Sequence, residues 1–360
     1  MIDQSNLYAL VMAGGSGTRF WPESTSKRPK QYLKLAGDYS LLKETLMRFE
    51  GLVPQERRLI VTIKQQQELA TANSLNLVGA DALIFEPAGR NTAPAILLSL
   101  ARLLKQGASL DDVVVVVPAD HVILNHQGFR QVMTEAAGLA HQLDKLITIG
   151  IPPTFPHTGY GYVQRGEQVS NGVNLVESFC EKPDFDTAKK YLASGKYLWN
   201  AGMFVGRIGR FLTEFSNHAP AIYEYLEPLT AALSCEQQLA TLYQQMPADS
   251  IDYAVMERSQ EVAVVAARFD WNDLGSWDAL ATVIEPVDGN IIAAARDHYF
   301  DQAQNNIVFA PNQFVTLINV NDLIVVATQG SVVVLPSSDA QKIKEVVNHL
   351  KGHPLESELL

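Results

Sequence analysis

The sequence is poor in cysteine and in long apolar runs, and each shortage excludes a class of protein. Only two of its 360 residues are cysteine, which excludes a disulfide framework and a metal cluster held by thiolates. The five consecutive valines at 113–117 are a run the length of a strand, whereas a membrane-spanning helix needs roughly 20 apolar residues. We therefore expect a globular protein with no membrane partner.

Positive charge is also scarce in this chain. It has 28 Lys and Arg against 39 Asp and Glu, which gives a formal net charge of -11. Because nucleic-acid binding usually needs a basic surface, we expect no nucleic-acid partner. The first ten residues, MIDQSNLYAL, lack the basic region and long apolar stretch of a secretory signal, so we expect a cytoplasmic location.

Apolar, β-branched runs alternate with helical patterns over the first 150 residues. Strands are predicted at 7–12, 58–63, 82–87, 111–120 and 145–151, and a glycine loop or helical patterns separate them. Continuous apolar runs of this kind are typical of parallel strands that helices cover on both faces. The predicted fold class is therefore α/β, with a Rossmann-like, mostly parallel sheet.

The pattern changes twice further along the chain. From Pro152, prolines and glycines precede two alternating segments that predict antiparallel strands. Beyond about Glu285, short apolar runs separated by Asn, Asp and Gly predict a few coils of a β-helix, followed by an amphipathic helix. No strict internal repeat is visible there. We predict a catalytic domain over 1–285 and a small β-helix-like and helical domain over 286–360.

A glycine loop follows the first predicted strand and is itself followed by a cluster of cations. Three glycines let a backbone turn tightly and direct its N–H groups at one anion. The loop fits neither common glycine motif, because Phe20 stands where the dinucleotide fingerprint has its third glycine and Arg19 follows Thr18 where a P-loop needs Gly-Lys-Ser/Thr. A polyphosphate cradle is the favoured interpretation, and an ordinary turn with a solvated basic face is the alternative. The loop residues are Gly14, Gly15, Ser16, Gly17 and Thr18, and the cations are Arg19, Lys27, Arg28 and Lys30.

These residues resemble a known family. AGGSGTR followed by PKQ is similar to the opening of the sugar-1-phosphate nucleotidylyltransferases, and GGSGTRFWP with RPKQYL resembles their mannose-1-phosphate guanylyltransferase branch. The resemblance implies that the loop and Arg19 surround a triphosphate and that Lys30 neutralises charge at the reacting phosphorus. The resemblance extends over nearly the whole chain, through five motifs in the family's order.

The third predicted strand ends in FEPAGRNTAPA, which opens the next helix. Donors at a helix N-terminus favour acceptor groups, although a simple capped turn explains the same residues. This segment resembles the base-side loop of the guanylyltransferase branch. The resemblance implies contacts with guanine or ribose from Glu86, Pro87, Arg90 and Asn91.

Two acidic residues far apart in the sequence are candidate metal ligands. Asp120 follows the valine-rich strand, where a carboxylate beside the glycine loop would need a cation, or would instead cap the next helix. The family has a magnesium-binding Asp at this point, and WNDLGSW resembles the segment that supplies the second, Asp273. The resemblance therefore implies Mg²⁺, or another divalent cation, held by these two carboxylates. His121 is interpreted as structural.

The antiparallel region supplies candidate contacts to a sugar phosphate. Tyrosines and glycines after Pro152 form a plausible wall for a sugar ring, although tyrosines in strands usually only pack. EKPD and WNAGMF resemble the family's sugar-binding segments, and SIDYAVMER is expected, on the same resemblance, to border the sugar pocket. The candidates are Gly161, Tyr162, Glu181, Lys182, Asn200 and Gly202.

Taken as a whole, the resemblance implies transfer of GMP from GTP to mannose 1-phosphate, with GDP-mannose and pyrophosphate as products. It also implies a homodimer, since the family uses a comparable C-terminal domain for dimer contacts. Two alternatives remain open: the same transfer with another sugar 1-phosphate, such as a heptose, or another nucleoside triphosphate, and a non-catalytic nucleotide-sugar sensor. A sensor is expected to have lost Arg19, Lys30 or one of the two Asp residues, and all of them are present.

Overall fold

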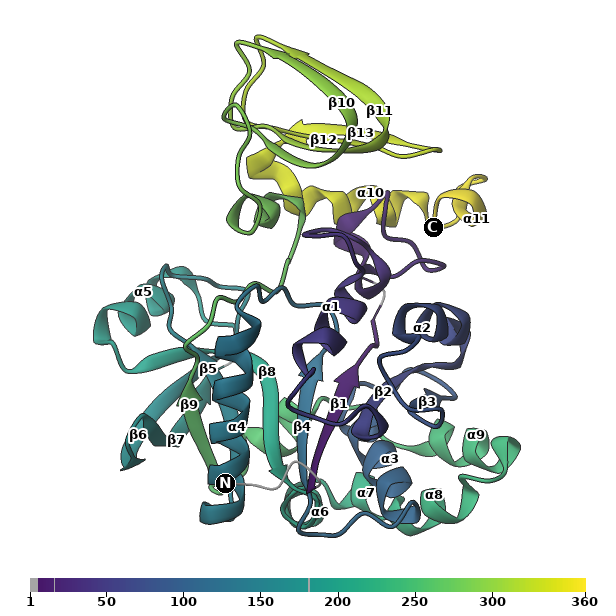
Figure 1. Ribbon diagram of the computed structural model, residues 1–360, viewed down its shortest axis with the longest axis vertical. Coiled ribbons are helices and arrows are strands. Elements are labelled where there is room, and N and C mark those ends of the chain that lie inside the picture. Colours follow the sequence, from purple (N-terminus) through teal and green to yellow (C-terminus); the bar gives the residue numbers. More distant parts are fainter. Residues whose placement is uncertain (1–5, 16, 181) are drawn as a thin grey trace. The chain divides into compact units, whose positions relative to one another are not determined.

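The computed structural model describes residues 6–15, 17–180 and 182–360 (Figure 1). They form two compact units that interleave along the chain. The first unit contains the residues up to Gly14, Leu46–Pro118 and Leu124–Asp270. The second contains Gly15–Thr45, Ala119–Ile123 and Trp271–Leu360. The predicted domain boundary at residue 285 stays a prediction, and this interleaving is a feature that the sequence did not suggest.

The first unit is built on one sheet, whose strand order is β3-β2-β1-β4-β8-β5-β9-β7-β6. In this sheet β7 and β8 run opposite to the other strands, so the prediction of a mostly parallel sheet is confirmed. Its strands are β1 (Leu7–Met12), β2 (Arg58–Ile63), β3 (Leu83–Glu86), β4 (Val113–Pro118), β5 (Leu146–Ile151), β6 (Tyr162–Ser170), β7 (Val173–Cys180), β8 (Tyr197–Arg207) and β9 (Val262–Ala266).

Helices cover this sheet, as the continuous apolar strands predict. The apolar α3 is buried along most of its length and packs against α8, while α4 lies across the strands β4, β5 and β8 (Figure 1). A rare π-helix, Asp252–Met256, precedes β9. The α-helices are α1 (Leu41–Arg48), α2 (Gln67–Ser74), α3 (Thr92–Lys105), α4 (His126–Leu143), α5 (Phe185–Ser194), α6 (Ile208–His218), α7 (Pro220–Tyr223), α8 (Leu226–Ala232) and α9 (Glu236–Gln245), of which α1 spans the boundary between the two units.

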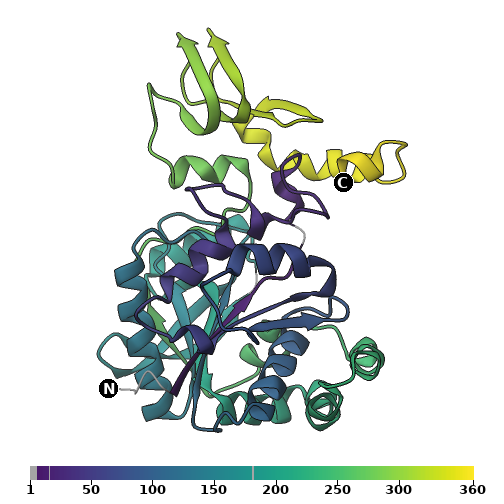
Figure 2. The ribbon, with the colours of Figure 1, turned by 45° about the vertical axis from the view of Figure 1, so that its right-hand side comes forward.

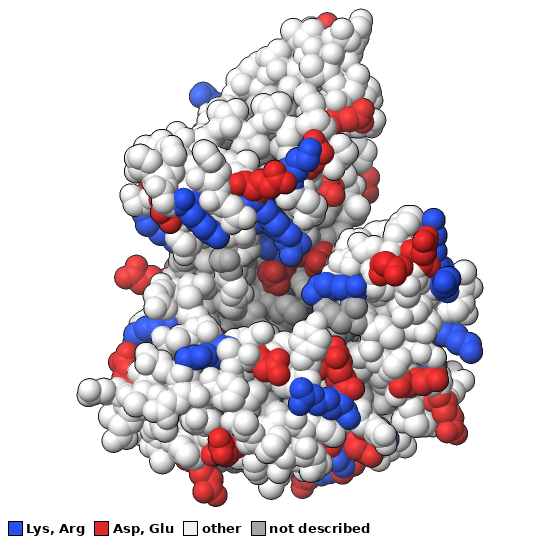
Figure 3. Space-filling view, turned by 180° about the vertical axis from the view of Figure 1, so that it is seen from behind, with Lys and Arg blue, Asp and Glu red and all other residues white. Residues whose placement is uncertain are grey.

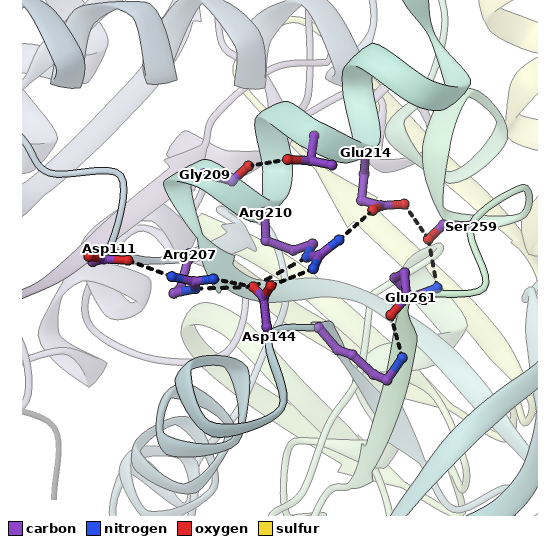
Figure 4. Close-up of polar contacts among 10 residues, drawn as sticks. Asp111, Asp144, Arg207, Gly209, Arg210, Glu214, Ser259 and Glu261 are labelled. Carbon is purple, nitrogen blue, oxygen red and sulfur yellow. Dashed lines mark hydrogen bonds and ion pairs between the residues drawn. The ribbon is translucent and has the colours of Figure 1, made fainter.

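A network of charged side chains connects several elements at the amino-terminal ends of the parallel strands (Figure 4). Asp144, just after α4, accepts hydrogen bonds from Arg207 at the end of β8 and from Arg210 on α6. Arg210 also donates to Glu214, whose side chain is only 1% exposed and accepts a second hydrogen bond from Ser259. The network therefore joins α4, β8, α6 and the segment that leads into β9.

The second unit contains a small sheet of β10 (Ile291–Asp301), β11 (Ile307–Ile318), β12 (Leu323–Ala327) and β13 (Val332–Pro336). The first three strands are parallel, and β13 is antiparallel to β12. Helices α10 (Ile343–Leu350) and α11 (Glu356–Leu359) follow. The β-helix-like domain that ends in a helix is therefore confirmed.

Two buried asparagines show how the coils of this domain stack. Asn290 and Asn306 are fully buried and lie 16 residues apart, and Asn306 Nδ2 donates to Asn290 Oδ1 at 2.9 Å. The Asn306 Oδ1 in turn accepts from the backbone N–H of Leu323 at 3.0 Å. Each asparagine thus satisfies backbone groups of the next coil. This spacing is a repeat that the sequence analysis missed.

The core of the second unit joins the glycine-loop segment to the C-terminal domain. Phe20 and Trp21 pack in one cluster with Trp277 and with Ile343 and Val347 of α10. The C-terminal residues also accept hydrogen bonds from this segment, at 3.0 Å from Trp21 Nε1 to the carbonyl of Leu359. The C-terminal helices, in yellow, and the purple segment after the glycine loop lie side by side in both ribbon views (Figures 1 and 2). The loop is therefore supported by residues more than 250 positions away.

Candidate active site

Backbone conformation at the glycine loop requires glycine at two positions. Gly15 has φ +99° and Gly17 has φ +56°, both in the region that side chains disfavour. A Cβ atom at Gly17 would lie 2.3 Å from Lys30 Cβ, so the loop packs directly on the PKQ segment. Gly14 precedes this turn, Thr18 begins the 3₁₀-helix Thr18–Phe20, and Ser16 lies outside the described residues.

Lys30 occupies the centre of the candidate site. It is only 6% exposed, and its Nζ donates to Asp120 Oδ2 at 2.9 Å and to the backbone carbonyl of Asp273 at 2.5 Å. One ammonium group thus joins the two segments that carry the predicted metal ligands. The structure brings Lys30, Asp120 and the backbone of Asp273 together, and the roles of these residues in binding and catalysis stay predictions.

An antiparallel bridge explains why these two segments meet. Val122 and Asn272 exchange both backbone hydrogen bonds, at 2.8 and 3.0 Å. Asn272 Oδ1 also accepts from the backbone N–H of Leu274 at 2.6 Å, which holds the fully buried Leu274 at φ +44°. Asp273 therefore lies between a paired residue and a constrained one, so its position is well fixed.

Charges around Asp120 favour its ionised form. Burial alone would raise the pKa of this carboxyl, but the charges of Lys30 and His121 and the Lys30 hydrogen bond outweigh it and lower the pKa below its ordinary value. The alternative role as a helix cap is excluded, because Asn125 caps α4. His121 Nδ1 accepts a hydrogen bond from Trp271 Nε1 at 3.1 Å, which agrees with a structural role.

Arg19 borders the same carboxylate cluster from the exposed side. Its Nη1 donates to the carbonyl of Gly275 at 3.1 Å. A Cβ atom at Gly275 would lie 3.4 Å from that nitrogen and 3.6 Å from Asp273 Oδ1, so guanidinium and carboxylate border one glycine. Arg19 and the Asp273 carboxylate therefore border Gly275, while Lys30, which packs against Gly17, holds Asp120.

The donor set fits a magnesium ion. Mg²⁺ prefers hard oxygen ligands and is usually held by one or two carboxylates, with waters and substrate phosphates as its other ligands. Asp120 and Asp273 supply two such carboxylates. Within residues 6–15, 17–180 and 182–360, no group of three or more His, Cys, Asp or Glu side chains is placed to enclose a metal. A metal bound here would therefore keep positions for phosphate oxygens.

The predicted base-side residues lie at the end of β3 and the start of α3. Glu86 is 5% exposed and accepts from the hydroxyl of Tyr243 at 2.5 Å, and its burial raises the pKa of its carboxyl to about 7 although the hydrogen bond opposes this. Arg90 donates to the carbonyl of Gln244, and Asn91 caps α3 at φ +69°. The carboxyl group of Glu86 is thus buried and hydrogen-bonded to another side chain of the protein. Pro87 follows it and is half-buried.

Four of the predicted sugar residues, Gly161, Tyr162, Asn200 and Gly202, lie where β6 and β8 pair or next to that pairing. The backbone N–H of Asn200 donates to the carbonyl of Gly161 at 2.8 Å, and its side-chain Oδ1 accepts from Gly202, which has φ +62°. Tyr162 is fully buried, and its hydroxyl bonds to the backbone of His157. Lys182 is exposed, and Glu181 lies outside the described residues.

Two further residues lie near these groups: Tyr243, which the sequence did not single out, and Asp252, which the sequence offered as a possible site carboxylate although acids on a helix face are usually solvated. Tyr243 contacts Glu86, and Asp252 Oδ1 accepts from Asn200 Nδ2 at 2.7 Å. Tyr243 belongs to an ordinary helical pattern that contains no distinguishing signal. Asp252 lies in the SIDYAVMER segment, whose resemblance to the family was the only available signal.

The surface outside the candidate site shows no concentration of one charge sign on the face drawn in Figure 3. On the face shown in Figure 3, basic and acidic side chains are interspersed instead of forming one basic patch. Among the helices of the described residues, none has the length and apolar character needed to cross a membrane.

Comparison with known proteins places the chain in a family. The family described as Nucleotidyl transferase matches residues 8–288, and the MannoseP isomerase/GMP-like beta-helix domain matches residues 302–350. The mannose-1-phosphate guanylyltransferase of Escherichia coli K12 is 37% identical over 360 residues, which cover 97% of this chain and 74% of the relative. Mannose-1-phosphate guanylyltransferase ManC of Salmonella typhimurium is 37% identical over 364 residues, with the same two coverages.

A solved structure agrees over nearly the full length. The Thermus thermophilus protein described as mannose-1-phosphate geranyltransferase has a TM-score of 0.88 and 35% identity, and the match covers 96% of this chain and 99% of that one. Both the family match and the relatives extend over the glycine loop, the two acidic segments and the base-side loop. The chain therefore belongs to the nucleotidyl transferase family, among the mannose-1-phosphate guanylyltransferases.

Proposed function

We propose that this protein transfers GMP from GTP to mannose 1-phosphate, with GDP-mannose and pyrophosphate as products. The observation that carries the proposal is the joining of Asp120 and the Asp273 segment by Lys30 beside a glycine loop. The relatives named for this activity are similar over 97% of the chain, which supports the same substrates.

The reaction needs charge control and positioning more than proton transfer. An oxygen of the sugar phosphate is already anionic, so no general base is required for its attack on the α-phosphorus. Holding two polyanions in line contributes roughly 7–11 kcal/mol to lowering the barrier. We assign to Lys30 and Arg19 the holding of negative charge on the α-phosphate and on the departing pyrophosphate, which their place beside Asp120 and Gly275 supports.

Asp120 and Asp273 are the residues that would hold Mg²⁺, in a family that generally uses a divalent metal. When bound, the ion would supply Lewis-acid polarisation of the α-phosphate oxygens. Lys30, at 2.9 Å from Asp120, keeps that carboxylate oriented and adds a second positive charge at the same point. The two carboxylates and one ammonium then act together.

The remaining candidate residues form three groups, according to the part of the substrates that we assign to each. We assign the triphosphate to the loop residues Gly14, Gly15, Ser16, Gly17 and Thr18. We assign the base and ribose to the loop of Glu86, Pro87, Arg90 and Asn91. We assign the sugar phosphate to Gly161, Tyr162, Glu181, Lys182, Asn200 and Gly202.

We also propose a homodimer and a cytoplasmic location. Apolar side chains of β11 and β13 support the dimer, because Phe314, Ile318, Val332 and Val334 are 58%, 58%, 71% and 60% exposed. Light scattering coupled to size exclusion tests this proposal, and a purely monomeric mass at micromolar concentration would contradict it.

Pyrophosphate release tests the function. The assay pairs GTP, ATP, CTP and UTP each with mannose 1-phosphate and with a heptose 1-phosphate, in Mg²⁺ and again in EDTA. We expect release with GTP and mannose 1-phosphate that EDTA abolishes. Faster release with the heptose or with another triphosphate would favour those substrates, and tight GTP binding without any release would favour a sensor.

A further inference from the structure

One segment, Tyr243–Asp252, is bonded to both predicted substrate loops of the first unit. Its first contacts are with the base-side loop: Tyr243 donates to Glu86 at 2.5 Å, and the carbonyl of Gln244 accepts from Arg90. Further along the segment, the backbone carbonyl of Asp249 accepts a hydrogen bond from the backbone N–H of Ala93, in α3, at 3.1 Å.

The same segment makes a second contact with α3 and then reaches the sugar side. The backbone N–H of Ile251 donates to Thr92 Oγ1 at 2.8 Å, and the next residue, Asp252, accepts from Asn200 Nδ2 at 2.7 Å. Asp252 is also the first residue of the π-helix Asp252–Met256. A π-helical turn is rare and occurs frequently at functional sites. Asn200 lies on β8, so one continuous segment connects the end of β3 with β8.

Burial makes the first of these contacts rigid. Tyr243 is fully buried and Glu86 is 5% exposed, so their hydrogen bond has no water to replace it. Losing the hydroxyl would leave a buried carboxyl with one partner fewer, which is costly. The base-side loop and Asn200 are therefore held at a fixed separation by one stretch of chain.

We infer that Tyr243 and Asp252 are positioning residues that set the spacing between the nucleoside and sugar-phosphate subsites, Tyr243 through the base-side loop and Asp252 through Asn200. This inference rests on the proposed function, which supplies the two substrates. Tyr243 acts on nucleotide affinity and Asp252 on sugar-phosphate affinity. Because both residues act through the side chains that they hold, the chemical step at the Lys30 cluster is expected to be unaffected.

Steady-state kinetics of pyrophosphate release test the inference with Tyr243→Phe and Asp252→Ala. We expect Tyr243→Phe to raise the KM for GTP at least fivefold while the KM for mannose 1-phosphate stays within twofold. Asp252→Ala is expected to raise the KM for mannose 1-phosphate at least fivefold while the KM for GTP stays within twofold. Asp252→Asn, which keeps an oxygen acceptor for Asn200, is expected to restore the KM for mannose 1-phosphate to within twofold of the original protein.

A control is available outside this segment. The exposed hydroxyl of Thr134, on α4, donates to the carbonyl of Arg130 at 2.8 Å, so Thr134→Val removes one hydrogen bond without touching Tyr243–Asp252 or either substrate loop and is expected to leave both KM values unchanged. Equal changes of both KM values in each variant, or none, would overturn the inference. Turnover by the original protein separately reports the proposed function. If that turnover is absent, calorimetric dissociation constants for GTP and mannose 1-phosphate replace the KM values, with the same expected split.

Discussion

At the scale of single residues, the site depends on how closely Lys30 is enclosed. Its backbone and Cβ lie against Gly17, and its ammonium reaches both acidic segments. A group held on several sides has little freedom to reorient when substrate binds, so less positioning entropy is lost. The role of Lys30 therefore depends on residues that carry no charge themselves.

Gly17→Ala tests this dependence. The new methyl group would meet Lys30 Cβ at 2.3 Å and would sit on a backbone at φ +56°, so Lys30 must move. We expect kcat to fall by about 100-fold or more, in line with the effect of misplacing a group by about 1 Å. Gly138→Ala is the control, since nothing lies within 4 Å of its added Cβ and it lies within α4. Turnover by Gly17→Ala at the level of this control would contradict the argument.

Glu86 predicts a pH dependence of stability. Burial raises the pKa of its carboxyl to about 7 from an ordinary 4.5, so the folded state binds the proton more tightly than the unfolded state. The stabilisation is complete below about pH 4.5 and is lost as pH rises through about 7. Relative to Glu86→Gln, which does not titrate, the original protein should lose about 3 kcal/mol of unfolding free energy across this window. Urea unfolding at pH 5 and pH 8 measures it, and parallel pH profiles would contradict it.

The sequence made some of these residues predictable and hid others. Lys30, Asp120 and Asp273 stand in short motifs next to glycines or at strand ends, where local pattern and resemblance both indicate a site. Tyr243 was not predictable, because its role comes from a contact with Glu86 that is 157 residues away. A side chain whose function is a long-range contact leaves no local pattern.

At the scale of elements, features that depend on local sequence were likewise predictable, and features that depend on long-range contacts were not. Continuous apolar runs, rich in valine for β4 and in isoleucine for β5, predicted these strands because their apolar character is local. The insertion of the antiparallel β8 between those two strands was not predicted, since strand order depends on long-range pairing. The 16-residue spacing of Asn290 and Asn306 was visible in principle, but the coils around it share too few residues to reveal it.

The charged network at the amino-terminal edge gives an element-scale prediction. Glu214→Gln breaks a buried contact with Arg210, for which we expect a loss of about 2–4 kcal/mol in unfolding free energy. Asp144→Asn should cost about 1 kcal/mol or less, because that side chain is 43% exposed and solvent screens its charge.

Asp144 also predicts a pH dependence of stability. The hydrogen bond from Arg210 is the largest influence on the pKa of Asp144 and lowers it. Burial opposes this effect, and the hydrogen bond from Arg207 lowers the pKa further. Its contribution is therefore present above the ordinary Asp range and is lost as pH falls through the lowered pKa. Thermal and urea unfolding of both variants provide the measurement, and kcat at neutral pH should stay unchanged in both. Equal costs for the two variants would contradict the role of burial.

At the scale of the whole molecule, the C-terminal domain belongs to the same compact unit as the catalytic cluster. Phe20 and Trp21 share a core with Ile343 and Val347, so residues 1–285 alone would leave that core open. We expect a chain cut after residue 285 to lose turnover and to expose apolar surface, measured by pyrophosphate release and by dye binding. A fully active 1–285 fragment would instead favour an independent catalytic domain.

The proposed reaction depends on Asp273 and Lys30 acting at one centre. The most direct test is kcat for pyrophosphate release from GTP and mannose 1-phosphate in Asp273→Ala and Lys30→Ala, with the folded state verified by circular dichroism and thermal unfolding. We predict that turnover is abolished in both variants while each remains folded. Near-normal turnover in either folded variant would contradict the account.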